Sequence, residues 1–149
     1  MTNIIGWREI IALPKLGIPE IKAKIDTGAR SSALHAFNIQ NFTQDGQEMV
    51  RFQVHPYQKD THQTITATAE LLEYREVKNS GGHIQNRPVI QTVVELGGKQ
   101  WEIELTLTNR DLMGFRMLLG RQAVRSHFLV DARRSFILSR IKSKFNLKS

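Results

Sequence analysis

The sequence predicts an all-β domain, a barrel or a sandwich, with one short helix near its C-terminal end. Three observations support this prediction. Apolar residues recur at every second position in most patterned stretches, which is the period of strands. Turn-forming residues separate these stretches at short intervals, and helical spacing occurs only after Gly120. The 149 residues suit a single domain with its own hydrophobic core, spanning 1–149.

The first half of the chain contains three clear strand patterns. Ile21–Ile25 alternates apolar and small or basic residues and stops at Asp26. Val50–Val54 alternates until a proline follows it, and Thr64–Ala69 places an isoleucine and two alanines on one face. We expect each stretch to form a strand with one buried face.

A glycine-rich hairpin joins the next two predicted strands. Val89–Leu96 and Trp101–Leu107 flank Gly97-Gly98-Lys99, and paired glycines favour the tight turns of β-hairpins. In the second arm, large apolar residues point one way, whereas glutamates and threonine point the other. This arm is therefore expected to place one face in the core.

The last third of the chain predicts the helix and a final hairpin. Arg121–His127 is expected to form the helix, and Phe128–Val130 is expected to pair with Ser135–Leu138. Between residues 116 and 148 lie nine Lys or Arg and a single acid, so this third is the expected positive face. A basic tail begins at about residue 139.

Composition excludes several classes of protein. The chain has no cysteine, which excludes disulfides, thiolate catalysis and cysteine-rich zinc sites. No stretch reaches the roughly eighteen apolar residues of a membrane-spanning helix, and residues 1–11 lack the pattern of a secretory signal. We therefore expect a cytoplasmic protein without membrane contact. The net charge of +7 favours an acidic partner, although solubility alone would also explain it.

The first candidate for chemistry is Asp26-Thr27-Gly28-Ala29. It follows an alternating strand directly, so the carboxylate of Asp26 is expected where the chain leaves the sheet. Gly28 permits a tight turn there. The tetrapeptide resembles the active-site loop of retropepsin-type aspartic proteases, although an ordinary turn can have the same sequence.

A second segment strengthens the resemblance. Arg116–Arg121 is an apolar run that ends in Gly120-Arg121 before the predicted helix. Retropepsins carry a similar apolar-Gly-Arg segment, which runs beside the active-site loop. Gly120 would then be small because another backbone passes close by. The two motifs also occur in the same order as in that family.

The similarity to one bacterial family covers roughly residues 6–140. That family is the group called ATP-dependent zinc proteases, which is associated with RimK-type ATP-grasp ligases. The stretches that carry it are Gly6–Glu9, Ile21–Arg30, Ser80–His83, Leu107–Arg110 and Phe115–Arg121. The resemblance implies a closed retropepsin-like β-barrel and a homodimeric aspartic peptidase. It also implies an acidic or glutamylated peptide substrate, since RimK-type ligases add glutamates to protein tails.

The implied catalytic residues are Asp26, Thr27 and Gly28. Because one chain offers one Asp-Thr-Gly, two copies would have to meet on a two-fold axis to form the pair of carboxylates. Asn79–His83 is the candidate for the flap over the site, although a plain turn would also explain its glycines. The implied substrate-binding residues are Ala29, Arg30, Ser80, Gly81, Gly82, Arg116 and Arg121.

Arg30, Arg116 and Arg121 have a structural alternative, in which they cap loops or remain solvated. The family's name mentions zinc and ATP, but the sequence contains no motif for binding either of them. The five histidines are scattered without a His-Glu-x-x-His motif, and no phosphate-binding Gly-x-x-x-x-Gly-Lys loop occurs. No metal or other cofactor is predicted.

Two other functions remain open at this stage. A catalytically silent retropepsin-like module would bind acidic peptide, or the ligase, without cleaving it. Nucleic-acid binding would suit the positive charge, but the basic tail has no aromatic stacking face. A serine nucleophile at Ser31 or Ser32 would need a base that neither has nearby in the sequence.

Overall fold

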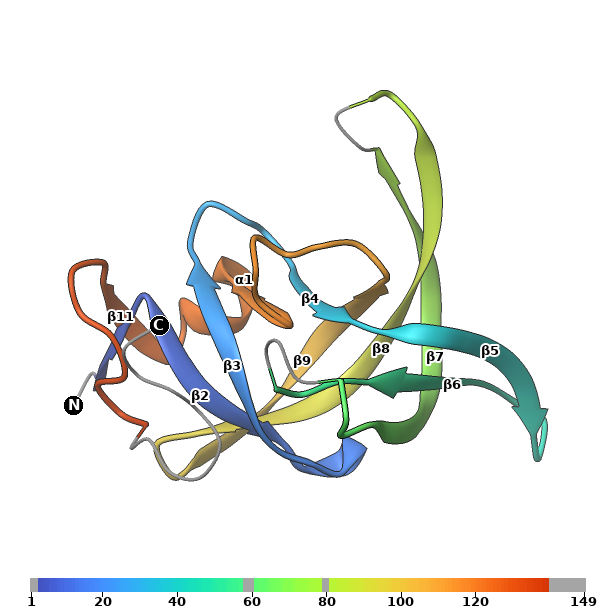
Figure 1. Ribbon diagram of the computed structural model, residues 1–149, viewed down its shortest axis with the longest axis horizontal. Helices are drawn as coiled ribbons and strands as arrows, with labels where there is room; N and C mark the ends of the chain where they lie inside the picture. The colour runs from blue at the N-terminus through green and yellow to red at the C-terminus, as the bar shows by residue number, and fades with distance from the viewer. Residues whose placement is uncertain (1–2, 58–60, 79–80, 140–149) are drawn as a thin grey trace.

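The computed structural model describes residues 3–57, 61–78 and 81–139 (Figure 1). Strands dominate these residues, and short turns connect them. The elements in chain order are β1 (Asn3–Gly6), β2 (Arg8–Leu13), a 3-10 turn η1 (Pro14–Leu16), β3 (Ile18–Asp26), β4 (Ser32–His35), β5 (Phe37–Gln44), β6 (Gln47–Val54), β7 (Ile65–Lys78), β8 (Ile84–Leu96), β9 (Lys99–Thr108), β10 (Met117–Gly120), α1 (Arg121–Val124) and β11 (Phe128–Asp131). Most of the predicted basic tail, residues 140–149, lies outside the described residues.

A closed barrel forms the body of the molecule. Its strands follow the order β2-β3-β10-β4-β9-β8, and β8 closes the ring by pairing with β2 at Ala12 and Glu95. The barrel is mixed, because β10 runs parallel to β3 and β4 runs parallel to β9, whereas the other neighbours are antiparallel. This architecture, with one short helix near the C-terminal end, confirms the predicted fold.

The core confirms the predicted alternation. Ile21, Ala23 and Ile25 of β3 are buried in the core. Also buried are Val50, Phe52 and Val54 of β6 and Ile103, Leu105 and Leu107 of β9. Burying an isoleucine, leucine, valine or phenylalanine side chain stabilises the fold by about 1.5–3 kcal/mol. These alternating strands therefore supply the main favourable term for closing the barrel.

One hairpin extends well beyond the barrel. β7 and β8 pair from Leu71 and Ile90 out to Lys78 and Ile84, and Figure 1 shows this hairpin rising past the end of the barrel where β3 ends. The predicted strand Thr64–Ala69 covers only the first part of β7. The outer part was missed because most of its side chains are exposed on both faces, so no apolar period marks it.

The predicted final hairpin is wrong. β11 pairs with β1 in parallel, from Asn3 beside Phe128 to Gly6 beside Asp131, and residues 135–138 form no strand. The Glu9 carboxylate instead accepts the backbone N–H of Ile137 at 2.8 Å. The apolar pattern of 135–138 reflects packing against the barrel, because Leu138 contacts the buried core.

The helix is shorter than predicted. It ends at Val124 rather than His127, because the His127 N–H donates to the Val124 carbonyl in a turn that leads into β11. Its buried residues are Ala123 and Val124, which face the core. None of the helices in the described ranges has the length and apolar character needed to span a membrane.

Candidate active site

Asp26 lies at the C-terminal end of β3, where the strand leaves the barrel. In the parallel register with β10 it stands beside Gly120, the last residue of that strand. The Asp26 side chain is partly buried, and its Oδ1 accepts the N–H of Gly28 at 3.1 Å. The turn after the strand therefore orients the carboxylate through a backbone donor, while Thr27 and Gly28 are exposed beside it.

The loop after Asp26 is held by the beginning of α1. The Ala29 N–H donates to the Asp26 carbonyl at 3.1 Å, and the Ala29 carbonyl accepts the N–H of Arg121 at 2.8 Å. One residue further along both segments, the Arg30 carbonyl accepts the N–H of Gln122 at 3.2 Å. The first N–H groups of a helix have no hydrogen-bond partner inside the helix, and the loop carbonyls supply one here. The loop and the helix therefore stabilise each other.

Gly120 is enclosed by this loop, as the resemblance to retropepsins implied. A Cβ atom at Gly120 would lie 2.4 Å from the Ser31 carbonyl oxygen and 3.0 Å from that of Ala29. The Gly120 N–H donates to Ser32 Oγ at 3.0 Å, and Ser32 is buried. Ser32 therefore braces the two segments, which gives its hydroxyl a structural role and argues against a nucleophile there.

Gly120→Ala is expected to destabilise the protein by about 1–3 kcal/mol, because the new methyl group would collide with backbone atoms that cannot rotate away. Urea unfolding followed by circular dichroism measures this change. Gly28→Ala is the matched control, since a Cβ there meets only Asp26 Oδ1 at 3.4 Å, an ordinary contact. Equal unfolding free energies for the two variants would contradict the tight passage at Gly120.

The β7–β8 hairpin provides the candidate flap. Its tip contains Gly81 and Gly82, both exposed, and Gly82 has a φ of 84°, which glycine adopts readily. Asn79 and Ser80, which also belong to the predicted flap, lie outside the described residues. The hairpin and the Asp26 loop occupy the same end of the molecule in Figure 1. Three large apolar side chains of the hairpin are exposed: Leu72, Tyr74 and Ile84.

The three predicted arginines occupy different positions. Arg121 holds the loop, because its Nη1 donates to the Gly28 carbonyl at 3.3 Å. Arg30 is exposed in the loop itself. Arg116 lies four residues before Gly120, partly buried, and is not part of the Asp26 loop. The structure thus brings Asp26–Arg30 and Arg121 together and leaves Arg116 and the flap glycines apart from them.

Arg116 belongs to a basic row that sequence analysis missed. Its carbonyl accepts the His35 N–H at 2.8 Å, and His35 lies beside Thr108 in the β4–β9 register. Continuing the β8–β9 register places Arg87 on the other side of Thr108, and the Arg87 charge interacts with that of Arg110. We call Arg116, His35, Arg87 and Arg110 the basic row.

The basic row combines positive charge with unused donors. Burial lowers the pKa of His35, and the neighbouring Arg116 lowers it further. Burial, with the charge of Arg110, also lowers the pKa of Arg87. The Nε atoms of Arg87 and Arg116 are buried without a hydrogen-bond partner among the described residues. An anionic group would satisfy both the charge and these donors.

The arrangement of the His, Asp and Glu side chains bears on whether the structure could hold a metal ion. Within residues 3–57, 61–78 and 81–139, no three His, Asp or Glu side chains come together. The Asp26 loop offers one carboxylate, which accepts a hydrogen bond from the Gly28 N–H, together with backbone amide groups. The chemistry that this loop offers is therefore that of a carboxylate acting as an acid or base.

A barrel strand that ends in Asp-Thr-Gly, beside an apolar strand that ends in Gly-Arg, is the architecture of retropepsin-like aspartic proteases. A hairpin that rises at the same end agrees with this class. Residues 4–141 match the family model described as "RimB-like: Retropepsin-like aspartic endopeptidase RimB". The chain belongs to this RimB-like family.

The relatives place this domain within longer proteins. The chain is 48% identical over 135 residues to a "Probable alpha-L-glutamate ligase" of Shewanella halifaxensis, covering 91% of this chain and 30% of that protein. It is also 48% identical over 129 residues to a protein with the same description from Desulfotalea psychrophila, covering 87% and 28%. The chain thus spans about 30% of the length of these curated relatives.

A solved structure supports the fold independently. The crystal structure of a Legionella pneumophila protein of unknown function superposes with a TM-score of 0.77 at 30% sequence identity. The superposition covers 93% of this chain and 99% of the Legionella chain. The barrel described above is therefore also the fold of a protein determined by crystallography.

Proposed function

We propose that two copies of this chain form an aspartic peptidase that hydrolyses peptide bonds in acidic or glutamylated peptides and works together with a RimK-type ligase. The observation that carries the proposal is the position of Asp26 at the end of β3, oriented by the Gly28 N–H and backed by Gly120. One chain supplies one such carboxylate. Hydrolysis by this class needs two carboxylates and a water molecule between them.

The mechanism follows from the symmetry of the dimer. Two Asp26 carboxylates brought together on a two-fold axis cannot both stay ionised, so one of them retains a proton. The ionised carboxylate takes a proton from water, and the resulting hydroxide attacks the scissile carbonyl carbon. The protonated carboxyl donates to the carbonyl oxygen. The C–N bond then breaks as a proton passes to the leaving amine. Thr27, exposed beside Asp26, would brace the two loops across the axis.

The acidic substrate is supported by charge and by the relatives. The net charge of +7 attracts acidic partners. The basic row holds two guanidinium nitrogens, Arg87 Nε and Arg116 Nε, that have no hydrogen-bond partner in the part of the chain that the structure describes. Carboxylates suit such donors because two parallel hydrogen bonds can form. The relatives are described as glutamate ligases, so a substrate with glutamate side chains would connect the two activities.

A mixing experiment tests the shared acid pair. Wild-type chain and the Asp26→Asn variant are refolded together in equal amounts, so that subunits combine at random. Peptide hydrolysis is expected to fall to about one quarter of that of wild type at the same total concentration, because mixed dimers lack one carboxylate. Independent active monomers would retain about one half, a result that would contradict the dimeric site.

A binding module is the second candidate, and the basic row favours it. This row lies away from the Asp26 loop and could hold acidic peptide without any hydrolysis. Under this alternative, a glutamate-rich peptide would bind with the same affinity to wild type and to Asp26→Asn, and neither would release products. Detectable turnover by wild type alone would reject it.

A further inference from the structure

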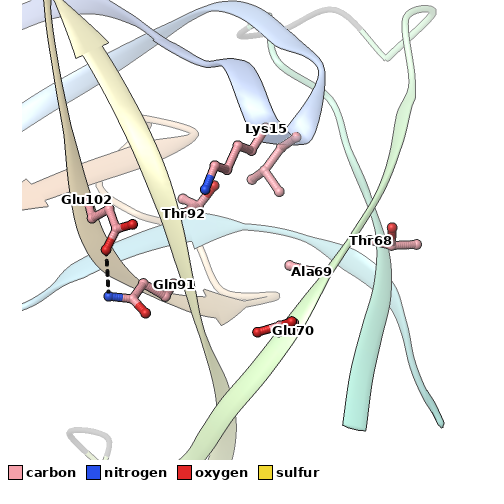
Figure 2. Close-up of a pocket in the computed structure, with 8 residues that line it drawn as sticks. Lys15, Thr68, Ala69, Glu70, Gln91, Thr92 and Glu102 are labelled. Carbon is pink, nitrogen blue, oxygen red and sulfur yellow. Dashed lines mark hydrogen bonds between the residues drawn. The ribbon is translucent and has the colours of Figure 1, made fainter. Parts of the chain in front are cut away.

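A cavity of about 510 Å³ lies at the base of the β7–β8 hairpin, at the end away from its tip. Figure 2 shows its walls, which come from η1, β7, β8 and β9. None of its residues belongs to the Asp26 loop or to the basic row. The residues that line it are Lys15, Leu16, Thr68, Ala69, Glu70, Gln91, Thr92 and Glu102.

The cavity exists because two paired strands separate. β7 and β8 are in register only as far as Leu71 and Ile90. Beyond this point β7 continues along β6, through Glu70 beside Met49, whereas β8 continues along β9. A fork therefore opens between the two strands, and η1 lies across it, with Leu16 buried at its inner end.

A buried hydroxyl without a partner lines the fork. Thr92 is 2% exposed, and its Oγ1 has no hydrogen-bond partner among the described residues. A buried hydroxyl that makes no hydrogen bond is costly, by about 1–3 kcal/mol. Figure 2 shows the Lys15 side chain extending toward Thr92, so a cation and a free hydroxyl share one side of the cavity.

Carboxylates occupy the other walls. Glu70 of β7 lies across the cavity from Lys15 in Figure 2, on the opposite branch of the fork. On β8 and β9, the Gln91 side chain donates from Nε2 to Glu102 Oε2 at 3.1 Å. The cavity therefore presents a positive site with a hydroxyl at one side and a negative site at another.

We propose that this cavity binds a free α-amino acid in its zwitterionic form. The ligand carboxylate would lie between the Lys15 ammonium and the Thr92 hydroxyl, and its ammonium group would face Glu70. Each charge of the ligand then meets a group of opposite charge. The proposal is independent of the peptidase function, because none of these residues takes part in it.

Other ligand classes fit the walls less well. A phosphate would be repelled by Glu70 and Glu102, and a metal ion would be repelled by Lys15. An apolar ligand would bury the charged walls without satisfying them, since only Leu16 and Ala69 are apolar. An amino acid with an acidic side chain would add a negative charge near the two glutamates. A neutral polar side chain could instead extend the hydrogen bonds of Gln91.

L-Glutamine is therefore the first probe, with L-glutamate as its charged counterpart. Isothermal titration calorimetry is expected to detect binding of L-glutamine, and L-glutamate is expected to bind about tenfold more weakly because of like-charge repulsion. N-Acetyl-L-glutamine lacks the ammonium group and L-glutamine amide lacks the carboxylate. Each derivative is expected to lose about tenfold or more in affinity, because one charge-assisted contact disappears.

Three conservative variants assign the contacts. Lys15→Met, Glu70→Gln and Thr92→Val should each weaken binding of L-glutamine by about tenfold. Thr92→Val also removes the unsatisfied hydroxyl, so its melting temperature should equal or exceed that of wild type, which separates loss of binding from loss of folding. Asp45→Asn is the control, because Asp45 lies at the β5–β6 turn with a φ of 51° that asparagine tolerates.

The proposal is overturned by any of three results. The first is the absence of binding by L-glutamine at concentrations up to about 10 mM. The second is equal binding of the N-acetyl or amide derivative. The third is binding that Lys15→Met and Glu70→Gln leave unchanged. None of these results would affect the peptidase proposal, which the Asp26 variant tests separately.

Discussion

Asp26→Asn is expected to lower peptide hydrolysis by about 10³-fold or more while leaving the fold intact. An amide can neither act as the ionised base nor hold the proton that the two carboxylates share. The loop should keep its conformation, because an asparagine Oδ1 can still accept the Gly28 N–H that Asp26 accepts at 3.1 Å. Cleavage of glutamate-rich peptides, followed by mass spectrometry, measures the loss.

The same change at an exposed turn provides the control. Asp45→Asn removes one carboxylate from the β5–β6 turn, far from the loop after β3, and should leave hydrolysis unchanged. Sedimentation should show the same oligomeric state for both variants and for wild type. If Asp26→Asn hydrolyses peptides at the wild-type rate, Asp26 is not the catalytic carboxylate.

Glu9→Gln is expected to cost about 3–5 kcal/mol in the free energy of unfolding. Glu9 is fully buried, and its two oxygens accept five donors from the chain ends. Four of them are backbone N–H groups, and the fifth is a hydroxyl. The donors are Gly6 N at 2.7 Å, Ile137 N at 2.8 Å, Leu138 N at 3.2 Å, Ser139 N at 3.0 Å and Ser139 Oγ at 2.7 Å.

The physical reason lies in the geometry of the donors. An amide can accept at one oxygen only, so its NH₂ group would face N–H donors that Glu9 now binds. A loss of this size is a large fraction of the stability of an ordinary domain, which is about 5–15 kcal/mol. Because Glu9 joins the beginning of β2 to residues 137–139, the amides of that segment should also exchange faster with solvent.

Urea unfolding and amide hydrogen exchange measure both effects. Glu48→Gln is the matched control, since Glu48 is exposed on β6 and a surface substitution of this kind usually changes stability by less than about 0.5 kcal/mol. If Glu9→Gln and Glu48→Gln unfold at the same urea concentration, the Glu9 carboxylate does not anchor the chain ends.

Local patterns were sufficient for β3, for β9, for the part of β8 in the barrel and for the Asp26 loop. Alternation in Ile21–Ile25 marks one buried face of β3, and this signal is contained within five neighbouring residues. The same holds for the turn at Asp26-Thr27-Gly28. In each case the residue types that the geometry requires are adjacent in the chain, so they can be recognised without knowing what packs against them.

The outer parts of β7 and β8 and the conformation of residues 135–138 could not be predicted from the sequence. The outer part of β7 has no buried face, so it carries no period to recognise. Residues 135–138 have an apolar pattern that suits a strand, yet their amides bind the Glu9 carboxylate rather than a neighbouring strand. A carboxylate more than 120 residues away in the chain decided the conformation of this segment.

By itself, the sequence determined the barrel class and the position of the loop that carries Asp26. The tertiary structure alone decided which distant side chains meet. It assembled the basic row from β4, β8 and the residues that flank β9 and β10. It also buried Glu9 beneath residues 137–139 and opened the fork whose cavity Thr92 lines. The reason is physical: periodicity and turns are encoded by near neighbours, whereas strand register between distant segments depends on how the whole barrel closes.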